Sequence, residues 1–164
     1  MSKTIKVSTI INAPLKTVWN EVSRLENHTN WMNDAEKIDF LSDNSSGISA
    51  KMKVLTVVGP IKLYDYMTVT EWVEEKTIAV DHVGIVTGKG KFILEEIDNN
   101  NTKFNWEETL KFPIYLGGFI GEFFGAPVLK LIWRKNLKNL KEIFLFLLIL
   151  QSPILNIFLV RDGI

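Results

Sequence analysis

The sequence predicts an α+β fold in which a seven-stranded antiparallel sheet curves around a long C-terminal helix, with two short helices after the first strand. Three observations lead to this prediction. Apolar residues near the C-terminus follow a helical repeat. A series of segments in which apolar and polar residues alternate precedes them, and turn-forming residues separate those segments. A chain of 164 residues favours a single domain and is long enough to bury a core.

The helical repeat covers residues 127–150. Its apolar residues recur at steps of three and four, which places them along one side of an α-helix: Leu129, Trp133, Leu137, Leu140, Phe144 and Leu147. The basic residues Lys130, Arg134, Lys138 and Lys141 recur on another side, which we interpret as exposed to solvent. Pro127 suits the first turn, because the N–H that proline lacks is unpaired there in any helix.

The N-terminal segment predicts a strand followed by two short helices. Apolar and polar residues alternate over residues 3–11, which places Ile5, Val7 and Ile11 on one face. Ala13-Pro14 then opens a helix, whose buried side carries Val18, Trp19, Val22 and Leu25. Turn formers around Trp31-Met32 indicate a second short helix or a turn.

Six further strands are predicted between residues 36 and 112. Alternation places His82 inside with Ile78 and Val80, and it places Glu108 inside with Phe104, Trp106, Leu110 and Phe112. Met52 and Phe92 face inward in their own strands. In the segment 62–73, Asp65 and Glu71 share a face, so we expect the opposite residues to point inward: Tyr64, Tyr66, Thr68 and Trp72.

The segment 113–125 combines four glycines with aromatic residues. One interpretation is a connector whose glycines allow close packing. The other is a mobile gate over a pocket, lined by Phe119, Phe123 and Phe124. The sequence leaves both open.

Composition and spacing exclude several functions. Nineteen basic and nineteen acidic residues cancel, so no overall field favours nucleic acid. The chain has no cysteine, and His28 and His82 lack a metal-binding spacing, so we expect neither a metal site nor another cofactor. Gly88-Lys89-Gly90 is too short for a phosphate loop and indicates a bulge. The N-terminus lacks the apolar run of a signal peptide, so we expect a cytoplasmic protein.

The segment 11–32 (INAPLKTVWNEVSRLENHTNWM) resembles the SRPBCC superfamily, which includes START-like proteins and polyketide cyclases/dehydrases. Gly88-Lys89-Gly90, Trp106 and the segment 136–141 also look like it, and the similarity spans residues 3–142. The resemblance implies a helix-grip fold, in which a curved antiparallel sheet encloses a cavity against the C-terminal helix. It also implies binding or transport of a hydrophobic molecule, or ring-closing or dehydrating chemistry in some members.

The predicted cavity gives two hypotheses for function. In the first, the protein binds or carries a hydrophobic small molecule such as a lipid, quinone or polyketide-like ring. The predicted cavity is then lined by Trp31, Met52, Tyr64, Tyr66, Phe92, Trp106, Phe119, Phe123 and Trp133. In the second, it is a cyclase or dehydratase without a cofactor, in which Glu108 and His82 act as an acid–base pair and a tyrosine orients the substrate. Alternatively, Glu108 and His82 lie near the rim of the sheet, solvated or hydrogen-bonded.

The residues after Glu142 depart from the superfamily pattern. We expect a domain over residues 1–142 and an apolar tail over 143–164 that extends the last helix. The tail has three interpretations: it folds back on the domain or on a second subunit, it anchors the protein to a membrane, or it has no selected function. A contact with a membrane or a second copy would involve residues 143–160.

Overall fold

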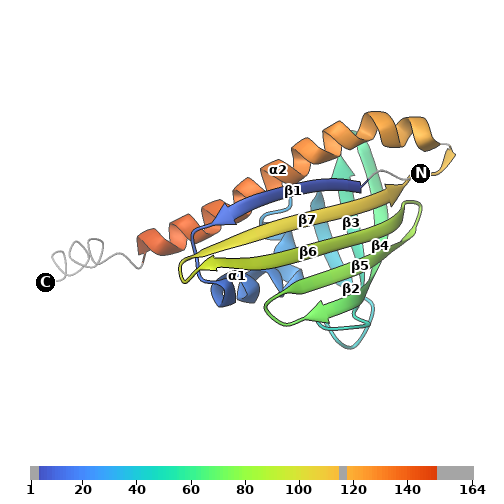
Figure 1. The fold of residues 1–164 in the computed structure, drawn as a ribbon. Coiled ribbons are helices and arrows are strands. Elements are labelled where there is room, and N and C mark those ends of the chain that lie inside the picture. The colour runs from blue at the N-terminus through green and yellow to red at the C-terminus, as the bar shows by residue number, and fades with distance from the viewer. Residues whose placement is uncertain (1–3, 115–117, 151–164) are drawn as a thin grey trace, which may run out of the picture.

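The computed structural model describes residues 4–114 and 118–150, and the side chains of all of these except 118–124. Seven strands form one antiparallel sheet in the order β1-β7-β6-β5-β4-β3-β2 (Figure 1). The strands are β1 (Thr4–Ile11), β2 (Ala35–Phe40), β3 (Lys51–Val58), β4 (Ile61–Val73), β5 (Thr77–Gly84), β6 (Thr87–Asp98) and β7 (Asn101–Lys111). The helices are α1 (Leu15–Val22), the 3-10 helix η1 (Leu25–Asn30) and α2 (Gly118–Leu150).

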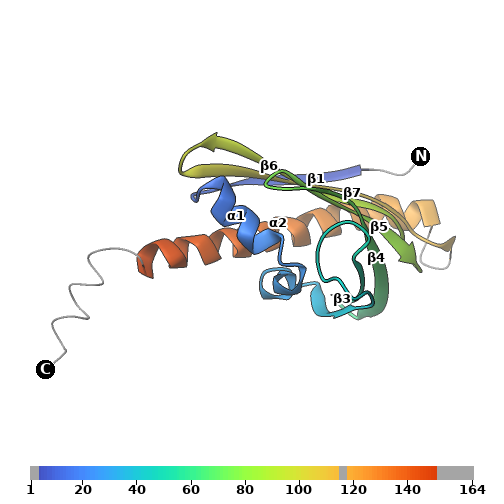
Figure 2. The ribbon, with the colours of Figure 1, turned by 90° about the horizontal axis from the view of Figure 1, so that it is seen from below.

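The sheet curves, and α2 lies along its concave side, with α1 on the same side (Figure 2). β1 closes one edge by pairing with β7, so consecutive hairpins build the rest of the sheet from β7 to β2. Buried apolar side chains pack between sheet and helix, and those from the described part of α2 are Ala126, Trp133, Leu137, Leu140 and Phe144. The predicted fold class is confirmed.

Burial follows the predicted alternation in most strands. β1 buries Ile5, Val7 and Ile11, and β7 buries Phe104, Trp106 and Glu108. Because side chains in a strand alternate between faces, the pattern assigns one face to the core and the other to solvent. The aromatic residues of this face pack around Trp31, whose side chain is fully buried.

The strand β4 departs from the prediction because it contains a bulge. Its register with β5 shifts between Val69 and Glu71. A bulge inserts one extra residue, so residues on its two sides no longer share the same alternation. Trp72 packs against the core as predicted, but before the bulge the faces are reversed: Asp65 is buried, whereas Tyr64 is 47% and Tyr66 41% exposed. The prediction that these two tyrosines line the cavity is wrong.

The helix α2 begins at Gly118 and not at Pro127 as predicted. Pro127 lies inside the helix, where it cannot donate a backbone hydrogen bond because proline lacks an N–H. Residues 118–125 are therefore helical and do not form an irregular connector. The side chains of Phe119, Phe123 and Phe124 lie outside the described residues, as does the gate that was predicted from them.

Asn136 of α2 holds the helix against the loop that precedes β2. Its side chain is fully buried. The side-chain oxygen accepts a hydrogen bond from the backbone N–H of Asn33 at 3.0 Å, and the amide donates to Asp34 at 2.6 Å. Both polar atoms of a buried amide are thus satisfied, so the contact fixes the position of α2 over the sheet.

The last turns of α2 leave the core. Phe144 is buried, but each residue from Leu145 to Leu150 is exposed, including Leu147 of the predicted stripe. Within residues 4–114 and 118–150, no helix is long and apolar enough to cross a membrane. Residues 151–164 of the predicted tail lie outside the described part of the chain. The domain boundary at Glu142 and contact of the tail with a membrane or a second copy stay predictions.

Candidate functional site

A cavity lies between the concave face of the sheet and α2. Its volume is about 130 Å³. Most of its wall is apolar, contributed by Leu25, Met32, Ala35, Ile38, Met52, Val54, Met67, Ile78, Val80, Phe92, Trp106, Leu110, Leu129 and Trp133. Trp106 of β7 and Trp133 of α2 stack with ring centroids 5.1 Å apart, so together they form one flat side of the chamber.

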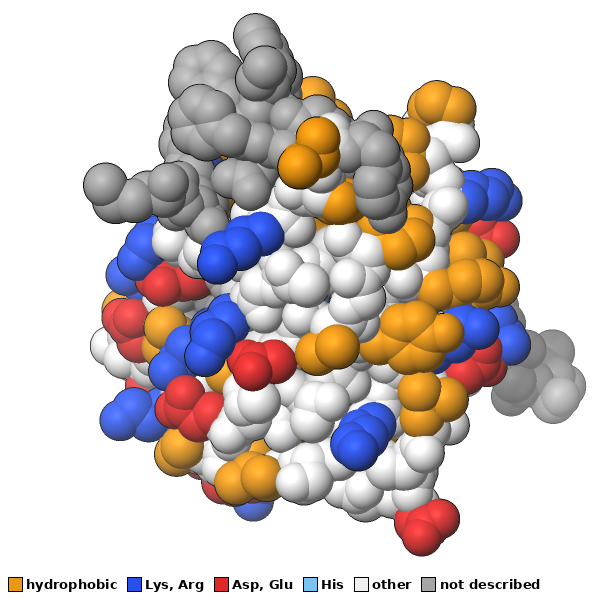
Figure 3. All heavy atoms as spheres, turned by 90° about the vertical axis from the view of Figure 1, so that its right-hand side faces the viewer, with side chains coloured by type: hydrophobic (Ala, Val, Ile, Leu, Met, Phe, Trp, Pro, Cys, Tyr) orange, Lys and Arg blue, Asp and Glu red, His pale blue; other side chains and the backbone are white. Residues whose placement is uncertain are grey.

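A second chamber adjoins the first. Its volume is about 330 Å³, and it lies between the ends of β3, β4 and β7 and the first half of α2. Four residues line both chambers: Thr56, Asp65, Leu110 and Leu129. Figure 3 views the end of the molecule where α2 begins and shows exposed apolar side chains among Lys, Arg, Asp and Glu side chains. The two chambers thus adjoin along a shared wall, and together they provide a mainly apolar space.

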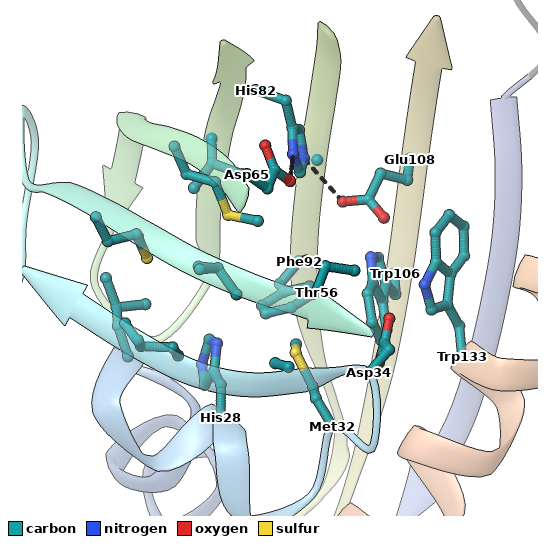
Figure 4. Close-up of a pocket in the computed structure, with 18 of the residues that line it drawn as sticks. His28, Met32, Asp34, Thr56, Asp65, His82, Phe92, Trp106, Glu108 and Trp133 are labelled. Carbon is teal, nitrogen blue, oxygen red and sulfur yellow. Dashed lines mark hydrogen bonds and ion pairs between the residues drawn. The ribbon is translucent and has the colours of Figure 1, made fainter. Parts of the chain in front are cut away.

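An imidazole ring held between two carboxylates is the polar centre of this space (Figure 4). Nδ1 of His82 lies 2.6 Å from Oδ2 of Asp65, and Nε2 lies 3.0 Å from Oε1 of Glu108. Each of the three residues is no more than 8% exposed. Asp65 comes from β4, His82 from β5 and Glu108 from β7, so the centre bridges four neighbouring strands of the sheet.

Gly90 of β6 makes this contact possible. In the sheet it pairs with Glu108 on one side and with Val80 on the other. A Cβ at this position would lie 2.6 Å from Oε1 of Glu108 and 3.1 Å from Nε2 of His82. Glycine therefore leaves the space in which the two side chains meet across β6. The predicted bulge at Gly88-Lys89-Gly90 is wrong, because the register of β6 with both neighbours is regular there.

Burial and the neighbouring charges act in opposite directions on His82. Burial alone lowers the pKa of His82, but its hydrogen bonds to Asp65 and Glu108 and the charges of these carboxylates outweigh burial and raise the pKa to about 10. Burial raises the pKa of Glu108 more than the His82 imidazolium lowers it. Both ring nitrogens of His82 are engaged, so His82 positions the carboxylates and does not offer an N–H to a ligand.

Two further polar side chains line the opposite wall. Burial lowers the pKa of His28 to about 4, so its ring is neutral. Because a carbonyl oxygen can only accept, Nε2 of His28 donates the hydrogen bond of 2.8 Å to Val22. Burial also raises the pKa of Asp34, although hydrogen bonds from Asn136 and Trp133 act in the opposite direction.

The structure brings most, but not all, of the predicted site residues together. Met52, His82, Phe92, Trp106, Glu108 and Trp133 line the inner chamber. Trp31 is fully buried in the core and is not among the residues that line either chamber, while Tyr64 and Tyr66 lie on the outer face. The side chains of Phe119 and Phe123 lie outside the described residues.

Sequence reasoning missed Asp65, the second carboxylate of the centre. Because of the bulge in β4, simple alternation assigned the Asp65 side chain to the wrong face of the strand. The only sequence signal for Asp65 was that the second ring nitrogen of a buried His82 needs a partner. His28, Met32 and Asp34 were also missed, because they come from short irregular segments without a clear period.

This architecture defines a class of protein. A curved antiparallel sheet that encloses a cavity against a long C-terminal helix is the helix-grip fold of START-like proteins. Solved structures with this fold include a START superfamily protein from Mycobacterium smegmatis, with a TM-score of 0.64 and 12% identity over 85% of this chain and 92% of that chain. A protein from Thermus thermophilus has a TM-score of 0.73 and 17% identity over 87% and 97%. The Zhui aromatase/cyclase from Streptomyces sp. R1128 has a TM-score of 0.69 and 12% identity over 88% and 94%.

The sequence profile of the family described as polyketide cyclase / dehydrase and lipid transport matches residues 2–144. The chain belongs to this family, within the SRPBCC superfamily. No curated protein matches its sequence. The solved structures share too little sequence with the chain to show more than its fold.

The raised pKa of His82 predicts how stability depends on pH. The folded state retains a proton on His82 that the unfolded state loses above a pKa of 6.5. The contribution of this proton to the free energy of unfolding is therefore fully present below pH 6.5 and is lost as pH rises towards 10. Between these values, wild type should lose about 1.4 kcal/mol of stability per pH unit relative to His82→Gln. Urea denaturation of both proteins at several pH values checks this. Parallel pH profiles would contradict it.

The position of Gly90 predicts an unusually costly alanine substitution. In Gly90→Ala the new methyl group displaces Glu108 from His82, so we expect a loss of about 2–3 kcal/mol. Gly125→Ala is the control: it lies in α2, its Cβ would meet nothing within 4 Å, and it should stabilise the helix by up to about 1 kcal/mol. Chemical denaturation measures both. An equal effect of the two substitutions would show that Gly90 is not needed for the contact.

Proposed function

We propose that the protein binds or transports one hydrophobic small molecule, such as a lipid, a quinone or a polyketide-like ring, in the cavity between the sheet and α2. The observation that carries this proposal is the pair of adjoining chambers, walled mainly by apolar side chains, beside an acid–imidazole–acid centre. Pockets for small molecules are mainly apolar and contain a few convergent polar groups that orient the ligand. Membership of a family described as polyketide cyclase / dehydrase and lipid transport supports the same class of ligand.

The size and shape of the space also favour a ligand. Small-molecule pockets usually have roughly 300–1,000 Å³, and the outer chamber alone, at about 330 Å³, reaches this range. Transfer of apolar ligand surface from water contributes about 25 cal/mol per Å². The flat stack of Trp106 on Trp133 offers an aromatic surface on which a ring can pack.

A second candidate function is a cyclase or dehydratase that needs no cofactor. The observation that favours it is the buried carboxyl group of Glu108 on the cavity wall, whose pKa burial raises. A carboxylate of raised basicity can remove a proton from the carbon next to a carbonyl group. In a dehydration, Glu108 would then give this proton to the departing hydroxyl group, which leaves as water, and would return to its starting state. The Zhui aromatase/cyclase shares the fold.

The geometry assigns different roles from those first expected of an acid–base pair. His82 has no free N–H for a substrate, because Asp65 and Glu108 accept from both ring nitrogens. Tyr64 and Tyr66 lie on the outer face and cannot orient a substrate in the cavity. In this second candidate Glu108 is the catalytic residue, and His82 and Asp65 are positioning residues.

Binding in the cavity predicts opposite results for two matched substitutions on β5. Val80 lines the inner chamber, whereas Val83 is 59% exposed on the other face. Val80→Trp fills the chamber, so we expect at least tenfold weaker binding of the neutral fluorophore N-phenyl-1-naphthylamine, and Val83→Trp should bind it as wild type does. Fluorescence titration measures both, with circular dichroism to confirm folding. If both variants bind like wild type, the ligand does not occupy this cavity.

A mass measurement separates the carrier from the dehydratase. We expect native mass spectrometry and organic extraction of wild type to recover one apolar molecule per chain. If the protein is a carrier, Glu108→Gln recovers the same molecule. If it is a dehydratase, Glu108→Gln retains its substrate and recovers a molecule heavier by one water. Recovery of no apolar molecule, together with no fluorophore binding, would contradict both functions.

A further inference from the structure

The two chambers meet at a carboxylate oxygen that has no partner. Asp65 lines both chambers, and its Oδ2 is engaged with His82. Among the described residues, no group donates a hydrogen bond to its Oδ1, which is buried. Burying an acceptor without a hydrogen bond is unfavourable, so a ligand donor that reaches Oδ1 binds more tightly than a ligand without a donor.

A donor with no partner lies in the wall of the inner chamber. Nε1 of Trp106 is buried, and no acceptor within the described part of the chain lies within hydrogen-bond distance. The wall therefore offers both an acceptor, on Asp65, and a donor, on Trp106. A hydroxyl group is the simplest ligand group that both donates and accepts hydrogen bonds. A carboxylate can accept from Trp106 but has no hydrogen to give to Asp65.

The charges around the space also disfavour an acidic ligand. Three carboxyl groups line it: Asp34, Asp65 and Glu108. The basic groups that the structure describes along the wall are His28, His82 and Lys91. His28 is neutral, both nitrogens of His82 are engaged, and Nζ of Lys91 lies 2.8 Å from Glu71. A ligand carboxylate would thus be buried beside other carboxylates without a free cation, which is strongly unfavourable.

The volumes indicate where the hydroxyl group lies along the ligand. The inner chamber, at about 130 Å³, is close to the engineered cavity of about 150 Å³ that accommodates benzene. A molecule too long for the inner chamber would extend into the adjoining outer chamber past Asp65, which lines both. The hydroxyl group is therefore expected near the middle of the occupied space or at the end of a ring that fills the inner chamber.

We propose that the ligand of this site is an uncharged, elongated apolar molecule with an alcohol or phenol hydroxyl group that donates a hydrogen bond to Oδ1 of Asp65 where the two chambers meet. This inference rests on the binding function proposed above and narrows its ligand class. Fatty acids and other apolar carboxylates are excluded as preferred ligands, although they share the same apolar tails.

Three probes with the same tail test this inference: 4-octylphenol, its methyl ether 4-octylanisole, and 4-octylbenzoate. Near pH 7 the phenol is neutral and the benzoate is charged. Their affinities are measured by displacement of N-phenyl-1-naphthylamine from wild type. We expect 4-octylphenol to bind at least tenfold more tightly than either of the other two probes, because it alone supplies the hydrogen-bond donor without a negative charge.

Substitution at Asp65 identifies the group that recognises the hydroxyl. Asp65→Asn removes the carboxylate with little change of shape, so the preference for the phenol over the benzoate should fall at least fivefold. Asp81→Asn is the matched control, since Asp81 is on β5 but lines neither chamber. It should keep the preference of wild type.

Each outcome distinguishes this inference from the function on which it rests. Equal binding of the three probes, or tightest binding of the benzoate, overturns the hydroxyl preference but leaves hydrophobic binding intact. Failure of wild type to bind the fluorophore and all three probes contradicts the proposed function itself. If Asp65→Asn does not fold, the order of affinities in wild type still decides the ligand class. An unchanged preference in folded Asp65→Asn overturns the role of Asp65.

Discussion

The buried imidazolium of His82, held between Asp65 and Glu108, is the interaction that constrains the rest of this structure. Charged groups in an apolar interior are stable only when each is paired and hydrogen-bonded, so the surrounding strands must hold all three side chains in register. The bulge in β4 turns Asp65 inward, and Gly90 leaves space on β6 for the contact between His82 and Glu108. A bulge in β4 and a glycine in β6 thus serve one electrostatic requirement.

The same centre organises the proposed binding site. It lies in the wall of two adjoining, mainly apolar chambers, and one of its carboxylate oxygens has no hydrogen-bond partner among the described residues. Asn136 anchors α2 to the loop before β2, whose Asp34 also lines the inner chamber. An apolar cavity, which provides affinity, is therefore joined to a small polar centre, which orients the ligand and selects among ligands with similar tails.

Much of this could be predicted from the sequence because the relevant patterns are local. Alternation in β1 and β7 placed Val7, Trp106 and Glu108 on the inner face, and the helical repeat identified the buried residues Trp133 and Leu140. The errors arose where a local rule was interrupted. A bulge reversed the faces of Tyr64 and Asp65, and a helix continued through Pro127 from a segment rich in glycine. The role of Gly90 depends on residues of two other strands, so no pattern within its own strand could indicate it.

The charge state of His82 is the property whose measurement tests the central interaction most directly. Nitrogen-15 NMR of the imidazole ring at pH 8 reports whether one or both ring nitrogens carry a proton. We expect a fully protonated ring, because its pKa is raised to about 10 by the two carboxylates. A neutral ring at pH 8 would contradict this expectation. One ring nitrogen would then carry no hydrogen, so His82 could not donate a hydrogen bond to both Asp65 and Glu108.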